Sequence, residues 1–485
     1  MNFACVLHLL GRLCMVLAAL LLLPLLVCLH DGTLDSEIAR RFLVLAAGTF
    51  AGGLLLRFGF RMRPDDFQIP EAFGVVTGAW LVFSLVGALP FLGSTGIPAV
   101  VDAFFESVSG VTTTGASILP DPALLDRALL FWRATLHLVG GLGIVALSVA
   151  ILPALGAGGN FLFQAEASGP EKDKLLPRIS SVSKVLWTTY IGLTVATIVA
   201  FLVAGMSPFD AICHGFATSS TGGFSTRADS LASFSAAVQW TAIAGMLLGG
   251  TNYVLLLMAA RGRPRALLAS TEWRTYLGIV ACVTLIACAV RFAAEGAPGG
   301  AEELLRSSLF STAAVITTTG FATVDYGLWA GSLKLLLIFC MLSGACAGST
   351  SGGHKVIRLI LYWKVVTREL RRLIRPSAVV VVRVQSRVIP DGILLKTVAF
   401  LAIFLLLWGA GSLALLFAGV PAEAAISGAI ACLTNVGPAF GELGPSGNYS
   451  GLGDGSKALM AFLMLAGRLE FFALFVLLSP QAWRR

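Results

Sequence analysis

Apolar stretches of about 20 residues recur along the whole chain, and each could cross about 30 Å of hydrocarbon as a helix. Only 12% of the 485 residues are charged, whereas soluble domains average about 25%. Such a chain cannot bury its apolar residues around one aqueous core. We therefore expect a polytopic membrane protein whose ten crossings lie near residues 10–29, 40–60, 73–93, 128–153, 184–205, 236–260, 274–294, 332–373 (interrupted), 393–419 and 457–480.

The charged residues predict an orientation. The net charge is +8, and a basic surplus can indicate nucleic-acid binding, but here lysine and arginine gather in every second link between the apolar spans. Short basic links face the cytoplasm, so both termini are expected there and no nucleic-acid partner is predicted. Residues 13–29 could be a signal-peptide core, but no small-residue cleavage site follows them, which favours a retained helix.

Shorter apolar segments interrupt this pattern at residues 98–111, 207–219, 303–316 and 421–433. Each is too short to span a bilayer, and counting them as spans would place the basic links on alternating sides. We interpret them as re-entrant half-helices that enter from the outer side. Non-helical backbone at that depth is tolerated only where it lines a cavity or is buried in protein.

A glycine stretch follows each short segment, and the unit repeats about every hundred residues. Aligned on Gly115, Gly222, Gly320 and Gly437, the stretches are VTTTGAS (111–117), SSTGGFST (219–226), ITTTGFAT (316–323) and TNVGPAFG (434–441). Small residues recur in the second span of each unit, as Gly140-Gly141, Gly249-Gly250, Gly344-Ala345 and Gly467-Arg468. Four such hairpins can close around one axis on which the glycine stretches meet.

The chemistry of this arrangement suits a dehydrated cation, because rings of backbone carbonyl oxygens can replace its hydration shell. Glycine permits the backbone conformations that aim successive carbonyls alike, and the negative dipole ends of the half-helices would point at the ion. The alternative is that glycine and threonine only pack helices closely. That explains Gly140-Gly141 and Gly249-Gly250, but not the glycines at the tips of segments too short to span.

These stretches resemble the Trk/Ktr/HKT superfamily of potassium transporters, most closely the TrkH branch of bacterial Trk systems, over essentially the whole chain. The resemblance implies an all-α membrane protein of four tandem M1–P–M2 units, similar to potassium-channel pore units, around one pore. Two extra N-terminal helices are typical of the TrkH branch. The implied domains are the two-helix domain 1–66, then pore units 67–165, 166–265, 266–380 (with an interrupted M2) and 381–485.

The resemblance also implies which residues bind the ion. Members whose first aligned glycine is serine tend toward sodium, so Gly115 favours potassium, and the fourth stretch departs from TTTG as the family's own fourth loop does. The potassium-binding residues carried over are Thr113, Thr114 and Gly115; Ser220, Thr221 and Gly222; Thr318, Thr319 and Gly320; and Asn435, Val436 and Gly437.

Two features indicate a gate. The third M2 is interrupted by GACAGSTSGGHK (344–355), which resembles the family's intramembrane gating loop, although an ordinary kink is the alternative. Arg468 lies in an otherwise nearly uncharged span, where the other units carry small residues, and a matching arginine in the family is an electrostatic barrier. A bridge from Arg468 to another unit or subunit stays open. The predicted gating residues are Gly348, Ser349, Thr350, Ser351, Gly352, Gly353 and Arg468.

The resemblance implies partners as well: a homodimer, and a cytosolic TrkA-type ring that binds nucleotides. This chain has no P-loop and no GxGxxG after a strand, so we expect no organic cofactor, and K⁺ is the transported ion. The basic stretch Lys364–Arg375 could dock the ring or anchor the span to membrane lipid, and both interpretations stay open. The expected location is the bacterial inner membrane.

Other classes of protein fit less well. An ion-coupled secondary transporter would usually have inverted halves, whereas every unit here has the same topology. An enzyme is not indicated, because the sequence shows neither a set of nucleophile, base and acid nor a metal-ligand spacing. A structural subunit would not need the glycine stretches. Passive conduction and coupling to H⁺ or Na⁺ both fit the same filter, so a potassium symporter of this fold remains the alternative.

Overall fold

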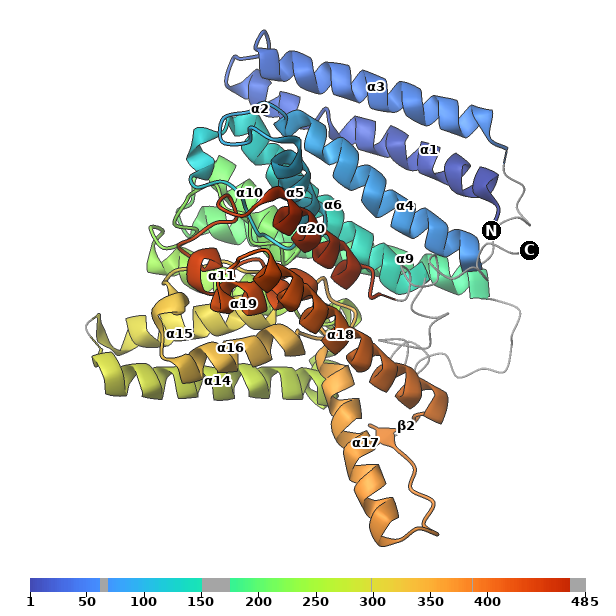
Figure 1. The fold of residues 1–485 in the computed structure, drawn as a ribbon, viewed down its shortest axis with the longest axis vertical. Helices are drawn as coiled ribbons and strands as arrows, with labels where there is room; N and C mark the ends of the chain where they lie inside the picture. The colour runs from blue at the N-terminus through green and yellow to red at the C-terminus, as the bar shows by residue number, and fades with distance from the viewer. Residues whose placement is uncertain (62–68, 151–174, 298, 386, 472–485) are drawn as a thin grey trace.

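The computed structural model describes the chain except residues 62–68, 151–174, 298, 386 and 472–485. The named secondary-structure elements of the described chain are helices, apart from one short antiparallel hairpin of β1 (Arg383–Val384) and β2 (Arg387–Val388). Six helices are long and apolar enough to cross a membrane, or seven if one bent pair is counted as a span, among the residues described. The all-α membrane fold predicted from the sequence is therefore confirmed (Figure 1).

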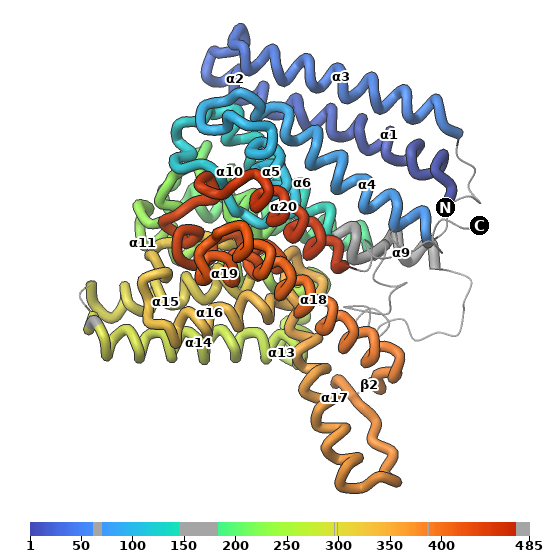
Figure 2. The backbone as a smooth tube through the Cα atoms, viewed as in Figure 1, coloured from blue at the N-terminus to red at the C-terminus, as the bar shows by residue number. Residues whose placement is uncertain are grey.

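The first helices form a layer against one side of the molecule (Figures 1 and 2). They are α1 (Phe3–Leu20), α2 (Pro24–His30) and α3 (Glu37–Gly59). Gly11 of α1 and Gly53 of α3 bring the two helices close together, since a Cβ built on Gly11 would lie 2.7 Å from the carbonyl oxygen of Gly53. Small residues at a helix crossing permit this approach, which packs α1 and α3 as a pair.

Four units follow, and each places a short helix between an outer and an inner one. Unit 1 holds α4 (Ile69–Ala88), η2 (Leu89–Phe91), α5 (Val100–Val111), η3 (Pro122–Leu124) and α6 (Arg127–Ala150). Unit 2 holds α9 (Leu175–Val203), α10 (Pro208–Ser219), α11 (Ala236–Gly249) and α12 (Tyr253–Ala260), with α13 (Pro264–Ala269) after it. Unit 3 holds α14 (Thr271–Glu295), α15 (Gly300–Ile316), η4 (Tyr326–Leu328), α16 (Gly331–Ser343) and α17 (Val356–Ile374). Unit 4 holds α18 (Asp391–Phe417), α19 (Ala422–Thr434), η5 (Gly441–Leu443) and α20 (Asp454–Arg468).

The short helices α5, α10, α15 and α19 lie where the sequence predicts half-helices, and each ends at its glycine stretch. Ser207 caps α10 by accepting a hydrogen bond from the Asp210 backbone at 3.1 Å. The acidic residues in the first turns, such as Asp102 and Glu423, suit the positive end of the helix dipole. The opposite, negative ends therefore converge where the glycine stretches begin.

The inner helices differ from the predicted continuous spans. The expected span 236–260 is not one straight helix, because α11 and α12 are bent by 110° across the break between Gly249 and Tyr253. Within the expected span 457–480, α20 ends at Arg468 and the chain turns through Glu470 and Phe471, which both have positive φ, while residues 472–480 lie outside the described residues. These helices are shielded by the outer ones, so they need neither the length nor the uniform apolarity of a lipid-facing span.

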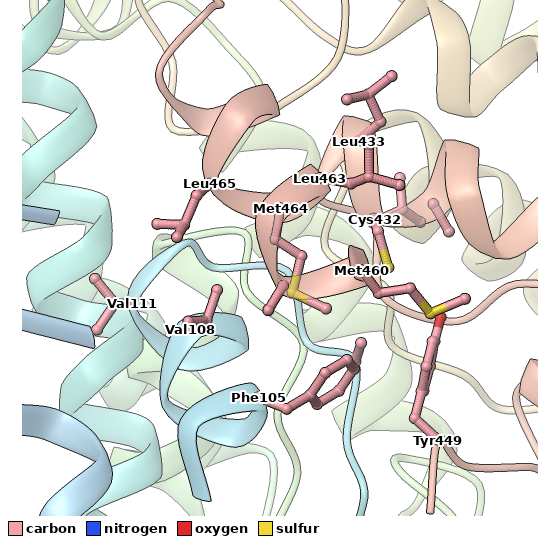
Figure 3. Packing of buried hydrophobic residues seen from close by; sticks show 14 of the residues in the cluster. Phe105, Val108, Val111, Cys432, Leu433, Tyr449, Met460, Leu463, Met464 and Leu465 are labelled. Carbon is pink, nitrogen blue, oxygen red and sulfur yellow. The ribbon is translucent and has the colours of Figure 1, made fainter. Parts of the chain in front are cut away.

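Unit 4 packs against unit 1, which closes the ring of units. Phe105, Val108 and Val111 of α5 face Met464 and Leu465 of α20 in a buried cluster (Figure 3). Near the N-terminal ends of these two helices, Lys457 of α20 forms a buried ion pair of 2.6 Å with Asp102 of α5. The first and last units of the chain are thus neighbours.

Helix α17 projects away from the other helices together with the β hairpin (Figure 1). A small apolar cluster holds this projection together, formed by Leu361 of α17, Val382 and Ile389 beside the hairpin, and Leu394 of α18. Arg368 of α17 pairs with Asp391 of α18 at 2.5 Å. The basic stretch Lys364–Arg375 therefore lies mostly on an extended arm rather than within the helical body.

Candidate functional site

The four glycine stretches share one backbone conformation. Directly after each half-helix the chain passes through a residue in the left-handed region, and a glycine with positive φ follows two positions later. The first set is Thr113 (φ 52°), Thr221 (54°), Thr318 (57°) and Asn435 (57°), and the second is Gly115 (82°), Gly223 (85°), Gly320 (78°) and Gly437 (94°). Non-glycine residues seldom adopt positive φ, so a strained conformation repeated four times marks a functional element.

This geometry corrects the alignment of the second stretch by one residue. Gly223, not Gly222, has the conformation of Gly115, while Gly222 takes the place of Thr114. The hydrogen bonds agree, because the Gly222 amide donates to the Ala217 carbonyl at 2.8 Å as the Thr114 amide donates to Ser109 at 2.9 Å. The triplet equivalent to Thr113-Thr114-Gly115 is therefore Thr221-Gly222-Gly223, and Ser220, predicted as an ion ligand, lies at the C-cap position of α10 as Thr112 does in α5.

The four positive-φ glycines form a closed ring. A Cβ on Gly115 would collide with the carbonyl oxygen of Gly222, and one on Gly223 with that of Thr319. A Cβ on Gly320 would likewise collide with the Val436 oxygen, and one on Gly437 with the Thr114 oxygen. The positive-φ glycine of each loop therefore packs against a carbonyl group of the next loop. That carbonyl belongs to the residue just before the next loop's own positive-φ glycine. The fourth loop packs in the same way against the first. The sequence prediction that the stretches meet on one axis is confirmed.

The ring is rich in free acceptors. Within the described part of the chain, the first two carbonyl groups of every triplet accept no hydrogen bond: Thr113, Thr114, Thr221, Gly222, Thr318, Thr319, Asn435 and Val436. A cavity of about 170 Å³ opens on the ring and is lined by residues of all four loops, including Gly115, Gly223, Gly320 and Pro438. Buried carbonyl groups without donors are costly unless a cation or water satisfies them, so the ring has the chemistry of a cation site.

His137 of α6 joins the first loop to the second. Its Nδ1 lies 2.8 Å from the Gly110 carbonyl oxygen, and its Nε2 accepts a hydrogen bond of 3.0 Å from the Phe224 amide. Since Nε2 is the acceptor, Nδ1 carries the proton and the ring is neutral. The imidazole also stacks on Phe224 at 4.3 Å. Sequence reasoning missed this residue, because a single histidine in an apolar span has no spacing to indicate its contacts.

A buried ion pair supports the same two loops from behind. Arg133 of α6 donates to Glu106 of α5 at 2.8 Å, and both side chains are almost fully buried. Arg133 also donates to the Ser225 carbonyl at 3.0 Å, while Glu106 accepts from the Ser117 hydroxyl and the Ile118 amide. The pair was not predicted, because its partners lie in three separate segments that only the fold brings together.

The interruption in the third inner helix lies directly beneath the ring. Between α16 and α17 the loop contacts the ends of the half-helices, since Thr350 Oγ1 donates to the Ser219 carbonyl at 3.0 Å. The Gly352 amide donates to Thr318 Oγ1 at 2.6 Å, and a Cβ on Gly352 would collide with the Thr434 carbonyl. The loop therefore contacts units 2, 3 and 4 at once, far more than a helix kink requires.

Side chains from two other segments hold this loop. Asn252, in the break between α11 and α12, donates to the Ala347 carbonyl at 2.7 Å and caps α12 through its oxygen. One carboxylate oxygen of Glu272 accepts from the Ala347 amide at 2.7 Å and from the Ile357 amide at 3.3 Å. The hydroxyl of Tyr253 lies 2.9 Å from Thr350 Oγ1. We call Asn252, Tyr253 and Glu272 the latch; the sequence analysis did not single them out.

Arg468 of unit 4 also contacts this loop. Its guanidinium donates to the Thr350 carbonyl at 3.0 Å and to the Gly140 carbonyl of unit 1 at 3.4 Å. The Arg468 side chain is 2% exposed, and its Cζ lies 5.8 Å from the centre of the Trp80 ring. The carboxylate nearest to Arg468 in sequence, Glu470, pairs instead with Arg358 of α17 at 2.5 Å. Arg468 instead binds backbone carbonyls beneath the ring.

The fold and the site define a class: a polytopic membrane protein in which four repeated units surround one carbonyl-lined candidate pathway, with a loop and an arginine in contact beside the ring. The comparisons agree with this class. The family TrkH, described as cation transport protein, matches residues 40–273 and 301–484. The chain therefore belongs to the TrkH family of cation transport proteins.

Relatives and a solved structure match the whole length. The chain is 37% identical to the Trk system potassium uptake protein TrkH of Escherichia coli strain K12, with 100% of both chains covered. It is 34% identical to the Trk system potassium uptake protein TrkG of the same strain, covering 88% of this chain and 87% of that one. The crystal structure of the potassium transporter TrkH from Vibrio parahaemolyticus superposes with a TM-score of 0.90 at 33% identity, covering 100% of each chain.

Proposed function

We propose that this chain is a potassium uptake transporter of the Trk type, which passes K⁺ through the ring of four loops. The observation that carries the proposal is the closed cycle in which Gly115, Gly223, Gly320 and Gly437 each lie against a carbonyl of the next loop. Carbonyl oxygens held in this way can replace the hydration shell of a monovalent cation without any charged side chain. Relatives that match the full length are named as potassium uptake proteins.

The ion ligands proposed are the backbone oxygens of Thr113, Thr114 and Gly115; Thr221, Gly222 and Gly223; Thr318, Thr319 and Gly320; and Asn435, Val436 and Gly437. Side chains keep these oxygens in place. Thr112 and Thr317 each approach the threonine two residues later at 2.7 Å, and Asn435 donates to Thr114 at 2.9 Å. Such tethers preorganise the loops, so the ligands need not rearrange when an ion arrives.

We further propose that the loop Gly348–Gly353 and Arg468 gate the pathway, and that the structure is in its closed state. Arg468 carries its charge to the level where an ion leaving the ring would pass, and the loop fills the space beneath Thr318 and Ser219. A fixed positive charge in a low-dielectric pathway repels a cation strongly. Opening then requires the loop to leave its contacts and Arg468 to leave the Thr350 carbonyl.

The remaining expectations are part of the same proposal. The proposed units are 1–66, 67–165, 166–265, 266–380 and 381–485. The boundary at 265/266 falls within α13, and the boundaries at 66/67 and 165/166 lie outside the described residues. A bacterial inner membrane, cytoplasmic termini, a homodimer and a nucleotide-binding TrkA-type partner follow from the charge pattern and the family. The arm formed by α17 and the β hairpin carries the basic stretch proposed to meet that partner.

Flux measurements on the purified chain in liposomes test the proposal. We expect K⁺ or Rb⁺ to enter the vesicles and Gly320→Ala to reduce entry, because a Cβ there collides with the Val436 carbonyl. Gly278, a glycine of the outer helix α14 with open space around its Cβ position, supplies the control Gly278→Ala. Equal flux in vesicles with and without the protein, or full activity of Gly320→Ala, would contradict the proposal.

A further inference from the structure

An apolar pocket lies on the membrane side of the pathway, beside the closure and outside the ring. Its volume is about 210 Å³, and every residue that lines it is apolar or glycine. The walls come from α1, α4, the end of α5 and α6. The lining residues include Leu13, Ala79, Trp80, Val111, Gly140 and Gly143.

Small residues create this space. Gly74 and Gly78 seat α1 close to α4, because Cβ atoms there would lie 2.8 Å from Met1 Sδ and 2.9 Å from a Leu10 methyl group. Ala79 of α4 and Gly143 of α6 have small side chains or none, so these two helices leave a gap between them. Larger residues at these positions would close the gap.

The floor of the pocket is part of the closure. Trp80, Val111 and Gly140 are buried, whereas the rim residues, such as Leu13, Val76 and Phe83, are partly exposed. The Trp80 ring lies under the Arg468 guanidinium, and the Gly140 carbonyl accepts a hydrogen bond from it. Val111 is the last residue of α5, directly before the first loop. An occupant would therefore touch groups that hold Arg468 and the ring.

The depth of the pocket identifies its surroundings. Leu13 and Ala79 lie near the middle of two candidate spans, Phe3–His30 and Pro70–Phe91, far from either headgroup region. Val16, one helical turn from Leu13 on the same side of α1, is 55% exposed, and Leu81 and Leu85 of α4 are exposed as well. The rim thus continues into a surface that faces hydrocarbon.

The apolar lining of the pocket excludes water and ions as its occupants. A cavity with apolar walls offers water no hydrogen-bond partners and stays dry, and a bare ion would find no ligand. An engineered apolar cavity of about 150 Å³ binds benzene, so this larger one can hold several methylene groups. Hydrocarbon is also the phase that surrounds the rim.

We propose that this pocket binds one acyl chain of a bilayer phospholipid, which packs against Trp80 behind the arginine of the closure. The inference depends on the pocket's geometry and membrane depth, not on which ion the ring passes. If no acyl chain binds there, the K⁺ flux measurements still test the proposed function independently.

Bromine-labelled lipid provides the test. The full chain is placed in nanodiscs of phosphatidylcholine with dibrominated acyl chains, and its structure is determined by electron cryomicroscopy. Bromine density is expected within contact distance of the Trp80 ring. The variant Ala79→Phe, whose ring fills the pocket, should lose this density, while Leu81→Phe on the exposed side of the same helix should keep it. If the four glycine loops keep their conformation in the map of a variant, that variant is folded.

Three results would overturn the proposal. The pocket of the unmodified chain could hold protein density in place of a brominated chain, or it could hold no density. Alternatively, the density could persist unchanged in Ala79→Phe, which would place the lipid elsewhere. Each result is read from the same maps.

Discussion

Arg468 donates a hydrogen bond of 3.0 Å to the carbonyl oxygen of Thr350. This bond connects the last residue of α20 to the middle of the interrupting loop beneath the ring. The same guanidinium reaches the Gly140 carbonyl of unit 1. One side chain therefore connects units 1, 3 and 4 at the level where the pathway would leave the ring. If this connection keeps the pathway closed, loosening it should raise conduction.

Replacing Arg468 by alanine should increase resting K⁺ flux. Hydrogen bonds to a charged group are each worth about 1.5–3 kcal/mol, so losing them should shift a closed-to-open equilibrium about tenfold or more. Arg468→Lys keeps the charge but only part of the hydrogen bonding, and a smaller increase is expected. Flux into liposomes, normalised to inserted protein, measures the effect. Flux of Arg468→Ala at or below the unsubstituted level would refute the barrier.

The corrected register of the second loop predicts different consequences for two adjacent glycines. Gly223→Ala introduces a side chain at positive φ, which costs about 1 kcal/mol in backbone strain before the collision with Thr319 is counted. Gly222→Ala instead meets the His137 ring at 2.5 Å. Both single variants should weaken K⁺ over Na⁺ selectivity.

The smaller side chain of His137→Asn separates these two causes. Combined with Gly222→Ala it should recover part of the selectivity, whereas combined with Gly223→Ala it should recover none. Selectivity is measured as the ratio of K⁺ to Na⁺ flux. If the second substitution rescued Gly223→Ala as well as Gly222→Ala, the register assigned here would be wrong.

The latch residue Asn252 can be tested by a substitution that separates its two roles. Asn252→Ser keeps an oxygen to cap α12, but its shorter side chain cannot reach the Ala347 carbonyl. We expect higher resting flux with little change in thermal stability. Asn252→Ala loses the cap as well, at about 1 kcal/mol, and should show both effects. Unchanged flux in Asn252→Ser would mean that the loop is held elsewhere.

Shortening the loop should raise flux by removing part of the closure. A deletion within Ala347–Gly353 removes contacts to Ser219 and Thr318, which hold the loop beneath the ring. Liposome flux in a deletion variant that remains monodisperse and inserted is the measurement. Reduced or unchanged flux would favour a purely structural break in the helix.

The buried pair Glu106 and Arg133 should matter for stability. Removing one partner of such a pair costs about 3–5 kcal/mol, because the remaining charge stays buried without compensation. Glu106→Gln should therefore lower the unfolding temperature in detergent markedly, and adding Arg133→Met should restore part of the loss. A double variant less stable than the single one would show that each residue acts separately.

Much of the fold could be predicted because membrane burial and helix periodicity are local properties. The half-helix predicted at 207–219 is α10 (Pro208–Ser219), and that at 421–433 is α19 (Ala422–Thr434). The second loop was misaligned because its two consecutive glycines look alike in sequence, and only the φ angles set by neighbouring loops distinguish Gly222 from Gly223. The break between α11 and α12 carries no proline, and the contacts of Asn252 with Ala347 stabilise it.

The reversal potential of currents through the purified chain, recorded under independent gradients of K⁺, Na⁺ and H⁺, tests the central claim most directly. A variant such as Arg468→Ala, expected to conduct more at rest, makes these currents easier to resolve. The account predicts a reversal potential that follows the K⁺ gradient and loses this dependence in Gly320→Ala. A potential that ignores K⁺, or one that survives Gly320→Ala unchanged, would contradict a potassium pathway through the ring of four loops.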